Sequence, residues 1–284
     1  MFDLEGNKRI IPKLLIDRPE PSLKGLESEE ANSLKEFFQV VEEIPAEAVM
    51  LGRSSILERL MAEENISAMR YFKMEALKET VQLKESIDKK GLLFLCMDKL
   101  DEDIRKVSAI AQELGTWTVG IAPPSSLLPE DIQSAEGIDN FISFKPDEGD
   151  ELGDWKICKI TKMLWHACQH IGLICIYATD IERLLHLGGV VHAGVGRGEG
   201  GNAHLKMALE MALFDFRRSG GIDFSGIKGV LLGVEMSPQD TDYDLREVID
   251  TGISAFGEDP LILVHAEIND KFKDSANVTI VGVD

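Results

Sequence analysis

Short apolar runs alternate with stretches of helical spacing from Ala48 to Phe144, and this alternation limits the possible folds more than any motif. Strands are predicted at residues 48–51, 69–74, 91–97, 117–122 and 141–144. Helices are predicted between them at 55–64, 75–89 and 103–114, where apolar residues recur every three or four positions. Apolar strands separated by helices are typical of a parallel sheet covered on both faces. The sequence therefore predicts an α/β fold.

The pattern changes after a long predicted helix at residues 155–169. Beyond it, predicted helices at 203–217 and 243–256 alternate with predicted strands at 229–234, 261–267 and 277–283. This order is typical of an α+β unit. We therefore expect two lobes joined by a central helix, divided into an N-terminal extension, a parallel-sheet lobe, the helix and a smaller α+β lobe at residues 1–45, 46–150, 151–175 and 176–284.

The N-terminal extension contains a predicted amphipathic helix that begins at Ser28. Its apolar residues recur at helical spacing: Ala31, Leu34, Phe37, Phe38 and Val41. Apolar residues in such a stripe must be buried. They would pack on the parent domain, on a second copy of the chain or in the groove of a partner. Phe37 and Phe38 are its candidate interface residues.

The net charge of the chain limits the classes of molecule that it can bind. Thirty basic and fifty acidic residues give a formal net charge of −20. Such a chain repels phosphate backbones and anionic lipid headgroups, so we expect neither nucleic acid binding nor direct membrane insertion. The four cysteines are scattered, and no basic start precedes an apolar core, so we expect buried thiols in a cytoplasmic protein.

A glycine-rich stretch, GVGRGEGGN at residues 194–202, leads into a predicted helix. Gly196, Gly198 and Gly201 fit the dinucleotide pattern G-x-G-x-x-G, and Asp223 follows at a suitable distance. One interpretation is a loop whose backbone N–H groups hold the phosphates of a nucleotide. The other is a flexible connection between a strand and a helix. The pattern alone leaves both open.

The histidines do not predict a metal site. His166 and His170 lie four residues apart and share one helix face, which is a spacing that metal ligands use. No carboxylate occupies a neighbouring turn of that face, so we expect both to be surface histidines of an amphipathic helix.

Six short segments, in one order along the chain, resemble the tubulin/FtsZ superfamily. They are AQELGTWTVGI (111–121), IDNFISFKPDE (138–148), TDIER after the central helix (179–183), GGVVHAGVGRGEG (188–200), IDFSGIKGVLLGV (222–234) and NVTIVGV (277–283). The resemblance covers roughly residues 46–284. It implies a Rossmann-type parallel-sheet lobe of the GTPase kind and a smaller α+β lobe, joined by a long central helix.

The resemblance also implies that two glycine loops should bind GTP, and both are altered here. The first corresponds to Leu51-Gly-Arg-Ser-Ser-Ile, with a single glycine, so that Gly52, Arg53, Ser54 and Ser55 are the nucleotide-binding candidates if binding is retained. The second corresponds to residues 97–103, which contain no glycine. Its carboxylates, Asp98, Asp101, Glu102 and Asp103, would repel a triphosphate, although they also suit the start of a helix. We therefore expect no bound phosphate.

The hydrolytic loop of the family is altered as well. Its asparagine falls on Cys175, its first acid on Tyr177 and its second acid on Asp180. A phenol with a pKa near 10 cannot replace a carboxylate in activating water. Asp180 is thus a catalytic remnant by ancestry or the N-terminal acid of a helix.

We therefore expect a diverged, non-catalytic FtsZ-like protein without a cofactor that acts as a cytoplasmic assembly, scaffold or regulatory protein. It would associate with itself or with a protein partner around Tyr177 and Asp180 or through its N-terminal helix. One alternative is a polymer-forming GTPase that uses GTP and Mg²⁺ with altered loops. A second is another nucleotide at residues 194–201. The sequence ends at Asp284, directly after the last predicted strand, so we do not expect direct participation in a division ring.

Overall fold

A computed structural model describes most of the second half of the chain and parts of the first. The described residues are 48–52, 69–73, 92–97, 100–122, 137–149, 153–169, 172–174, 176–187, 191–201, 203–220, 224–257 and 259–284. Within them, nine strands form one mixed sheet in the order β2-β1-β3-β4-β5-β6-β9-β7-β8. The predicted helices at 55–64 and 75–89 and the N-terminal helix lie outside the described residues.

The first five strands are parallel to one another. They are β1 (Ala48–Gly52), β2 (Met69–Lys73), β3 (Leu92–Cys96), β4 (Trp117–Ala122) and β5 (Asn140–Phe144). Helix α4 (Glu102–Leu114) connects β3 to β4 and ends at Gly115, whose φ of 70° is a conformation that glycine adopts without strain. Every residue of β3 is buried, as expected for a central parallel strand. The predicted strands and this helix are confirmed to within two residues.

The rest of the chain begins with two helices, α6 (Asp154–Cys168) and α7 (Ala178–Leu185). It continues with β6 (Val191–Glu199), α8 (His204–Gly220), a short 3₁₀ helix η4 (Phe224–Gly226), β7 (Gly229–Met236), α9 (Asp242–Phe256), β8 (Leu261–Ile268) and β9 (Ser275–Val283). Strand β9 lies between β6 and β7 and is antiparallel to both, whereas β7 and β8 are parallel. The predicted helices and strands of this half are confirmed.

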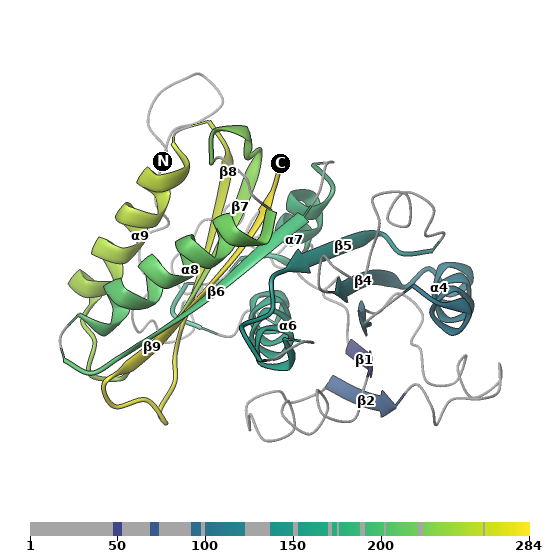
Figure 1. Cartoon of the computed structure of the whole chain (residues 1–284), viewed down its shortest axis with the longest axis horizontal. Helices are drawn as coiled ribbons and strands as arrows, with labels where there is room; N and C mark the ends of the chain where they lie inside the picture. Colours follow the sequence, from purple (N-terminus) through teal and green to yellow (C-terminus); the bar gives the residue numbers. More distant parts are fainter. Residues whose placement is uncertain are drawn as a thin grey trace, which may run out of the picture.

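The two halves share the sheet. Strand β5 pairs with β6 in parallel through Ile142 with Val191, Ser143 with His192 and Phe144 with Ala193. Figure 1 shows α6 in the middle of the molecule, with β4 and β5 on one side and β6–β9 on the other. The sheet thus runs without a break past α6, and the predicted boundaries at residues 150 and 175 stay a prediction.

Helix α6 is buried on nearly all sides. Its apolar residues, with Trp165 fully enclosed, pack against both β3–β5 and the C-terminal strands in one core. The three described cysteines, Cys96, Cys158 and Cys168, are buried free thiols, as predicted. Burial raises the pKa of Cys168 to about 12, so this thiol stays protonated and unreactive. No helix among the described residues has the length and apolar character of a membrane span.

Candidate functional site

The carboxyl edge of β1 and β3 is the first candidate site. The order β2-β1-β3 means that the chain leaves β1 toward one side of the sheet and later returns on the other. In open α/β sheets, ligands bind at such a switch point, in the crevice beyond the carboxyl ends of the strands. Gly52 is the last residue of β1 at this edge. The other predicted nucleotide-binding residues, Arg53, Ser54 and Ser55, lie outside the described residues.

The N-terminus of α4 faces the same edge because the helix follows β3. Its N-cap is Asp101, whose Oδ1 accepts a hydrogen bond from the backbone N–H of Ile104 at 3.1 Å. Glu102 and Asp103 occupy the first turn. A helix N-terminus binds anions through its free N–H groups and its dipole. Here the carboxylate of Asp101 already takes one of those donors, and Glu102 and Asp103 add two more negative charges to the first turn. Asp98 lies outside the described residues.

The loop before α7 is the second candidate site. Tyr177 is the N-cap of α7, and the backbone N–H of Tyr177 donates a hydrogen bond to Asp180 Oδ2 at 3.4 Å. The first turn of α7 therefore uses the carboxylate of Asp180, as expected of an acid at this position. Cys175, and the interface candidates Phe37 and Phe38, lie outside the described residues. The catalytic and interface roles predicted for Tyr177 and Asp180 stay predictions.

The predicted glycine loop is a strand. Gly196 and Gly198 lie inside β6 and pair with Val278 and Ala276 of β9. A Cβ atom on Gly198 would lie 1.8 Å from the carbonyl oxygen of His204, and one on Gly196 would lie 2.1 Å from the carbonyl oxygen of Ala208. These glycines allow α8 to approach the strand, and the helix fills the space that a pyrophosphate would need.

Both interpretations of residues 194–201 placed a loop here, and this is wrong, because β6 continues to Glu199; nucleotide binding at this segment stays a prediction. Gly201 lies beyond the end of β6 with a φ of 69°, which marks the turn into α8. The spacing of the glycines does not distinguish a loop from a strand, because glycines two residues apart also fit the face of a strand on which a helix packs closely. Asp223, the acidic residue of the pattern, lies outside the described residues.

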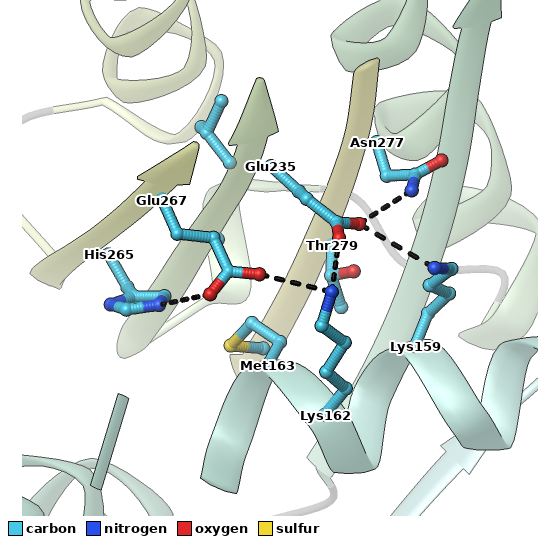
Figure 2. A pocket seen from close by; sticks show the side chains of 10 residues that line it. Lys159, Lys162, Met163, Glu235, His265, Glu267, Asn277 and Thr279 are labelled. Carbon is cyan, nitrogen blue, oxygen red and sulfur yellow. Dashed lines mark hydrogen bonds and ion pairs between the residues drawn. The ribbon is translucent and has the colours of Figure 1, made fainter. Parts of the chain in front are cut away.

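A buried group of charges between α6 and the C-terminal strands was not predicted, and Figure 2 shows its two lysines and its two glutamates. We call it the enclosed cluster: Lys159, Lys162 and His166 of α6, Glu235 of β7 and Glu267 of β8. Lys162 Nζ contacts both carboxylates, with Glu267 Oε1 at 3.2 Å. Lys159 Nζ lies 3.6 Å from Glu235 Oε2, and His166 Nδ1 lies 2.5 Å from Glu267 Oε2. The carboxylate of Glu267 is the most exposed member, at 12%.

Neutral side chains complete the coordination of Glu235. Asn269 Nδ2 donates to Glu235 Oε1 and Asn277 Nδ2 donates to Glu235 Oε2, each at 2.6 Å. Burial alone raises the pKa of this carboxyl, but the charges of Lys159 and Lys162 and the hydrogen bonds outweigh burial and hold the pKa below its ordinary value. Glu235 is therefore ionised and fixed in position.

Glu267 is held in the same way. Burial again raises the pKa of its carboxyl, whereas the hydrogen bond with His166, the nearby ring of His265, whose Nε2 lies 3.9 Å from Glu267 Oε2, and the charge of Lys162 lower the pKa far below its ordinary value. The ring of His265 is also fixed, because its Nδ1 lies 3.1 Å from the carbonyl oxygen of Ile174. The cavity that these side chains line has a volume of about 20 Å³, which suits one water molecule. The cluster therefore joins α6 to the sheet and does not form a ligand pocket.

In the predicted helix at residues 155–169, Lys159, Lys162 and His166 lie on the side opposite the apolar residues. The prediction that His166 is a surface histidine is wrong, because its side chain is 1% exposed. His170 lies outside the described residues. The missed signal was in the strands: Glu235 and Glu267 each interrupt the end of an apolar run, GVLLGVEM and LILVHAEI, and they are direct partners in the β7–β8 register.

A second group of charges holds the start of α6. We call it the groove cluster: Asp147, Lys156, Asp215 and Arg218. Lys156 Nζ lies 2.7 Å from Asp215 Oδ1 and 2.9 Å from Asp147 Oδ1, and it donates to the carbonyl oxygen of Lys145 at 2.6 Å. Asp215 Oδ2 accepts a hydrogen bond from the backbone N–H of Val195. No group of described residues has the ligands for a metal ion.

Comparisons with known proteins agree on the fold. No protein-family model and no curated protein matches this sequence. An FtsZ dimer from M. jannaschii superposes with a TM-score of 0.69 at 18% identity, covering 91% of this chain and 93% of that chain. CetZ from Methanosaeta thermophila gives a TM-score of 0.57 at 9% identity, covering 83% and 86%. TubZ from Bacillus thuringiensis serovar israelensis, solved as GDP-form protofilaments, gives 0.52 at 8% identity, covering 89% and 90%. The chain has the tubulin/FtsZ-like fold, as its resemblance implied.

Proposed function

We propose that this chain is an FtsZ-like assembly protein of the cytoplasm that associates with itself without binding or hydrolysing GTP. The observation that carries the proposal is the N-terminus of α4, where Asp101 accepts the hydrogen bond of Ile104. In the family it resembles, the loop at this position holds phosphate. The role that follows is that of a scaffold or regulator, not of an enzyme.

The electrostatic balance at α4 supports the absence of a triphosphate. Two like charges about 4 Å apart cost roughly 1 to 4 kcal/mol between water and a surface-like dielectric. Asp101, Glu102 and Asp103 would each face the phosphates. The helix dipole contributes less than about 1 kcal/mol per charge in the opposite direction. Repulsion exceeds attraction at this edge of the sheet.

Self-association is supported by the proteins that share the fold. One was solved as an FtsZ dimer and another as TubZ protofilaments. In this chain the loop before α7 carries a partly exposed Tyr177 at its tip, with Asp180 bound to the first turn of the helix. We propose this loop as one contact surface between copies.

A second candidate function is GTP-dependent polymerisation, and the sheet order favours it. The switch point between β1 and β3 is where such a fold accepts a ligand, and Gly52 lies at its edge. Arg53, Ser54 and Ser55 would then supply donors to the phosphates of a nucleotide bound with Mg²⁺. The two candidates differ in whether nucleotide is needed.

Two measurements on the purified full-length chain separate them. Static light scattering over a concentration series without nucleotide should show a mass that rises with concentration. Titration with fluorescent GTP, with and without Mg²⁺, should show no saturable binding. Asp101→Asn is the matched variant, because asparagine caps a helix as well as aspartate but carries no charge. Saturable, Mg²⁺-dependent binding with turnover in the unaltered chain would favour the GTPase and reject our first proposal.

A further inference from the structure

Helix α8 carries an exposed apolar stripe. Met207, Met211 and Phe214 follow one another at i, i+4 and i+7, and their side chains are 44%, 49% and 68% exposed. Most other large apolar side chains among the described residues are covered. Three such neighbours on one helix face form a contiguous patch of the kind that marks a protein interaction site.

The stripe borders a groove of about 570 Å³. Trp155 at the start of α6 and Val195 of β6 add apolar surface to it. Arg197 and Arg218 bring positive charge to its rim, and Asp147 and Glu210 bring negative charge. The groove therefore offers an apolar floor and a mixed charged rim, which suits an amphipathic helix.

The same sequence contains a segment with the matching pattern. Residues 28–43 lie outside the described residues, and their sequence predicts a helix with Leu34, Phe37, Phe38 and Val41 on one face. The segment has five glutamates and one lysine, whereas the groove has two arginines against Asp147, Glu210 and Asp215, so the match between the two rests on their apolar stripes and not on charge. Two apolar stripes with the same spacing can cover each other.

The chain between residues 28–43 and β1 is short, which favours a neighbouring copy as the molecule whose segment fills the groove. Ala48 and Gly194 are separated by four strand spacings across the sheet and by about seven residues along the strands, as the strand registers show. The two displacements together give a distance of about 30 Å. Gly194 touches α8 at Phe216. A helix that ends at residue 43, followed by an extended link to Ala48, carries Phe38 only about 25 Å. In Figure 1, α6 also lies between β1 and α8.

We propose that the groove beside Met207, Met211 and Phe214 receives residues 28–43 of a second copy of this chain. This inference rests on the self-association proposed above and names one of its contacts. The helix of one copy lies with Phe37 and Phe38 against the stripe on α8 of the next copy. Such a strap links copies without any nucleotide.

Cross-linking between two single-cysteine, full-length chains tests the proposal. The background carries Cys175→Ser, because the other three cysteines are buried. One chain carries Phe38→Cys and the other Phe214→Cys, and they are mixed with a short bismaleimide. We expect about tenfold more heterodimer than in a control pair, because a bound segment holds the thiols at a millimolar effective concentration. The control pair combines Phe38→Cys with Thr251→Cys, an exposed position on α9.

Each result decides the question. Heterodimer in excess of the control, lost when Met211→Glu is added to the Phe214→Cys chain, supports the strap. An internal cross-link in a chain that carries both cysteines, at dilutions where no dimer remains, would show that the segment folds back on its own chain. Equal cross-linking in both pairs, while light scattering shows assembly, would overturn the strap and leave the proposed function standing. A monomer at every concentration would remove the proposed function and the strap together.

Discussion

The two charge clusters on α6 contain the same chemistry in different surroundings. The enclosed cluster holds Lys159 and Lys162 against two carboxylates, and its most exposed member is 12% exposed. The groove cluster holds Lys156 and Arg218 against two carboxylates, but Asp147 is 56% exposed and Arg218 is 32% exposed. Water screens the pairs that Asp147 and Arg218 make, but it hardly reaches the enclosed cluster or the Lys156–Asp215 pair, whose side chains are 2% and 7% exposed.

The difference teaches which part of α6 is fixed. In the enclosed cluster each charge depends on a partner, because an unpaired ion in a low dielectric costs several kcal/mol. Its members come from α6, β7 and β8, so the middle of the helix is tied firmly to the C-terminal strands. The groove cluster ties the first turn of α6 to α8 through the buried Lys156–Asp215 pair, and to the loop after β5 through an ion pair with the exposed Asp147 that solvent can partly replace. The contact of α6 with that loop can therefore adjust more easily than its contacts with α8 and the strands.

Among variants that test this comparison, Glu235→Gln should cause the largest loss of stability. The change keeps the shape of the side chain but leaves Lys159 and Lys162 with one carboxylate fewer. We expect a loss of about 3 to 5 kcal/mol in the free energy of unfolding, as when one partner of a buried pair is removed. Urea unfolding followed by tryptophan fluorescence measures it, because Trp165 lies on α6. Glu247→Gln on the exposed face of α9 is the control, and a Glu235→Gln loss below about 1 kcal/mol would contradict the enclosed character of the cluster.

Gly198→Ala tests the packing of α8 on β6, which supports the groove cluster. The added Cβ would lie 1.8 Å from the carbonyl oxygen of His204, so α8 must move away from β6. We expect a loss of about 2 to 3 kcal/mol, measured in the same way. Because α8 carries Asp215 and Arg218, the shift should weaken the groove cluster and spare the enclosed one. Gly226→Ala is the matched control, since a Cβ there meets nothing within 4 Å; equal losses in the two variants would refute the close packing.

The strands could be predicted from the sequence because their signals are local. Runs such as LLFLC of β3 and NVTIVGV of β9 are apolar enough to require burial on both faces wherever the rest of the chain lies. The switch point at β1 and β3 could not be predicted in this way, because an alternation of strands and helices does not say which strands are neighbours in the sheet. The alteration of the phosphate loops is inferred from residue type alone and stays a prediction.

The enclosed cluster could not be predicted in the same way. Lys159, Lys162 and His166 form a polar stripe, and a polar stripe on a helix usually faces water. Their burial depends on Glu235 and Glu267, which are at least 73 residues away in sequence from their partners on α6. The glycine pattern failed for a related reason: Gly196 and Gly198 suit a nucleotide loop or a helix packing face equally, and only the position of α8 decides.

Acid should weaken the enclosed cluster in a defined direction. The pKa values of Glu235 and Glu267 lie below the ordinary 4.5, so their stabilisation is complete above that pH and is lost as the pH falls. We expect a loss of about 1 to 2 kcal/mol per carboxyl between roughly pH 5 and pH 3. Urea unfolding at several pH values measures the slope. Glu267→Gln should flatten it, and a slope identical to that of the unaltered chain would remove Glu267 from this account.

Asp147→Asn should have the smallest effect and the strongest dependence on salt. The pKa of Asp147 is lowered only because Lys156 and Arg218 outweigh its partial burial, and more than half of its side chain meets solvent. Lys156 keeps Asp215 at 2.7 Å after the change. We expect a loss of about 0.5 to 1 kcal/mol at low salt that fades toward zero at about 1 M salt, where the Debye length is about 3 Å. Glu235→Gln should keep most of its effect in the same salt series, because the enclosed charges are not screened. If both variants lost their effects together, the pairs of Glu235 would be as open to solvent as those of Asp147, and the contact of α6 with β7 would be no firmer than its contact with the loop after β5.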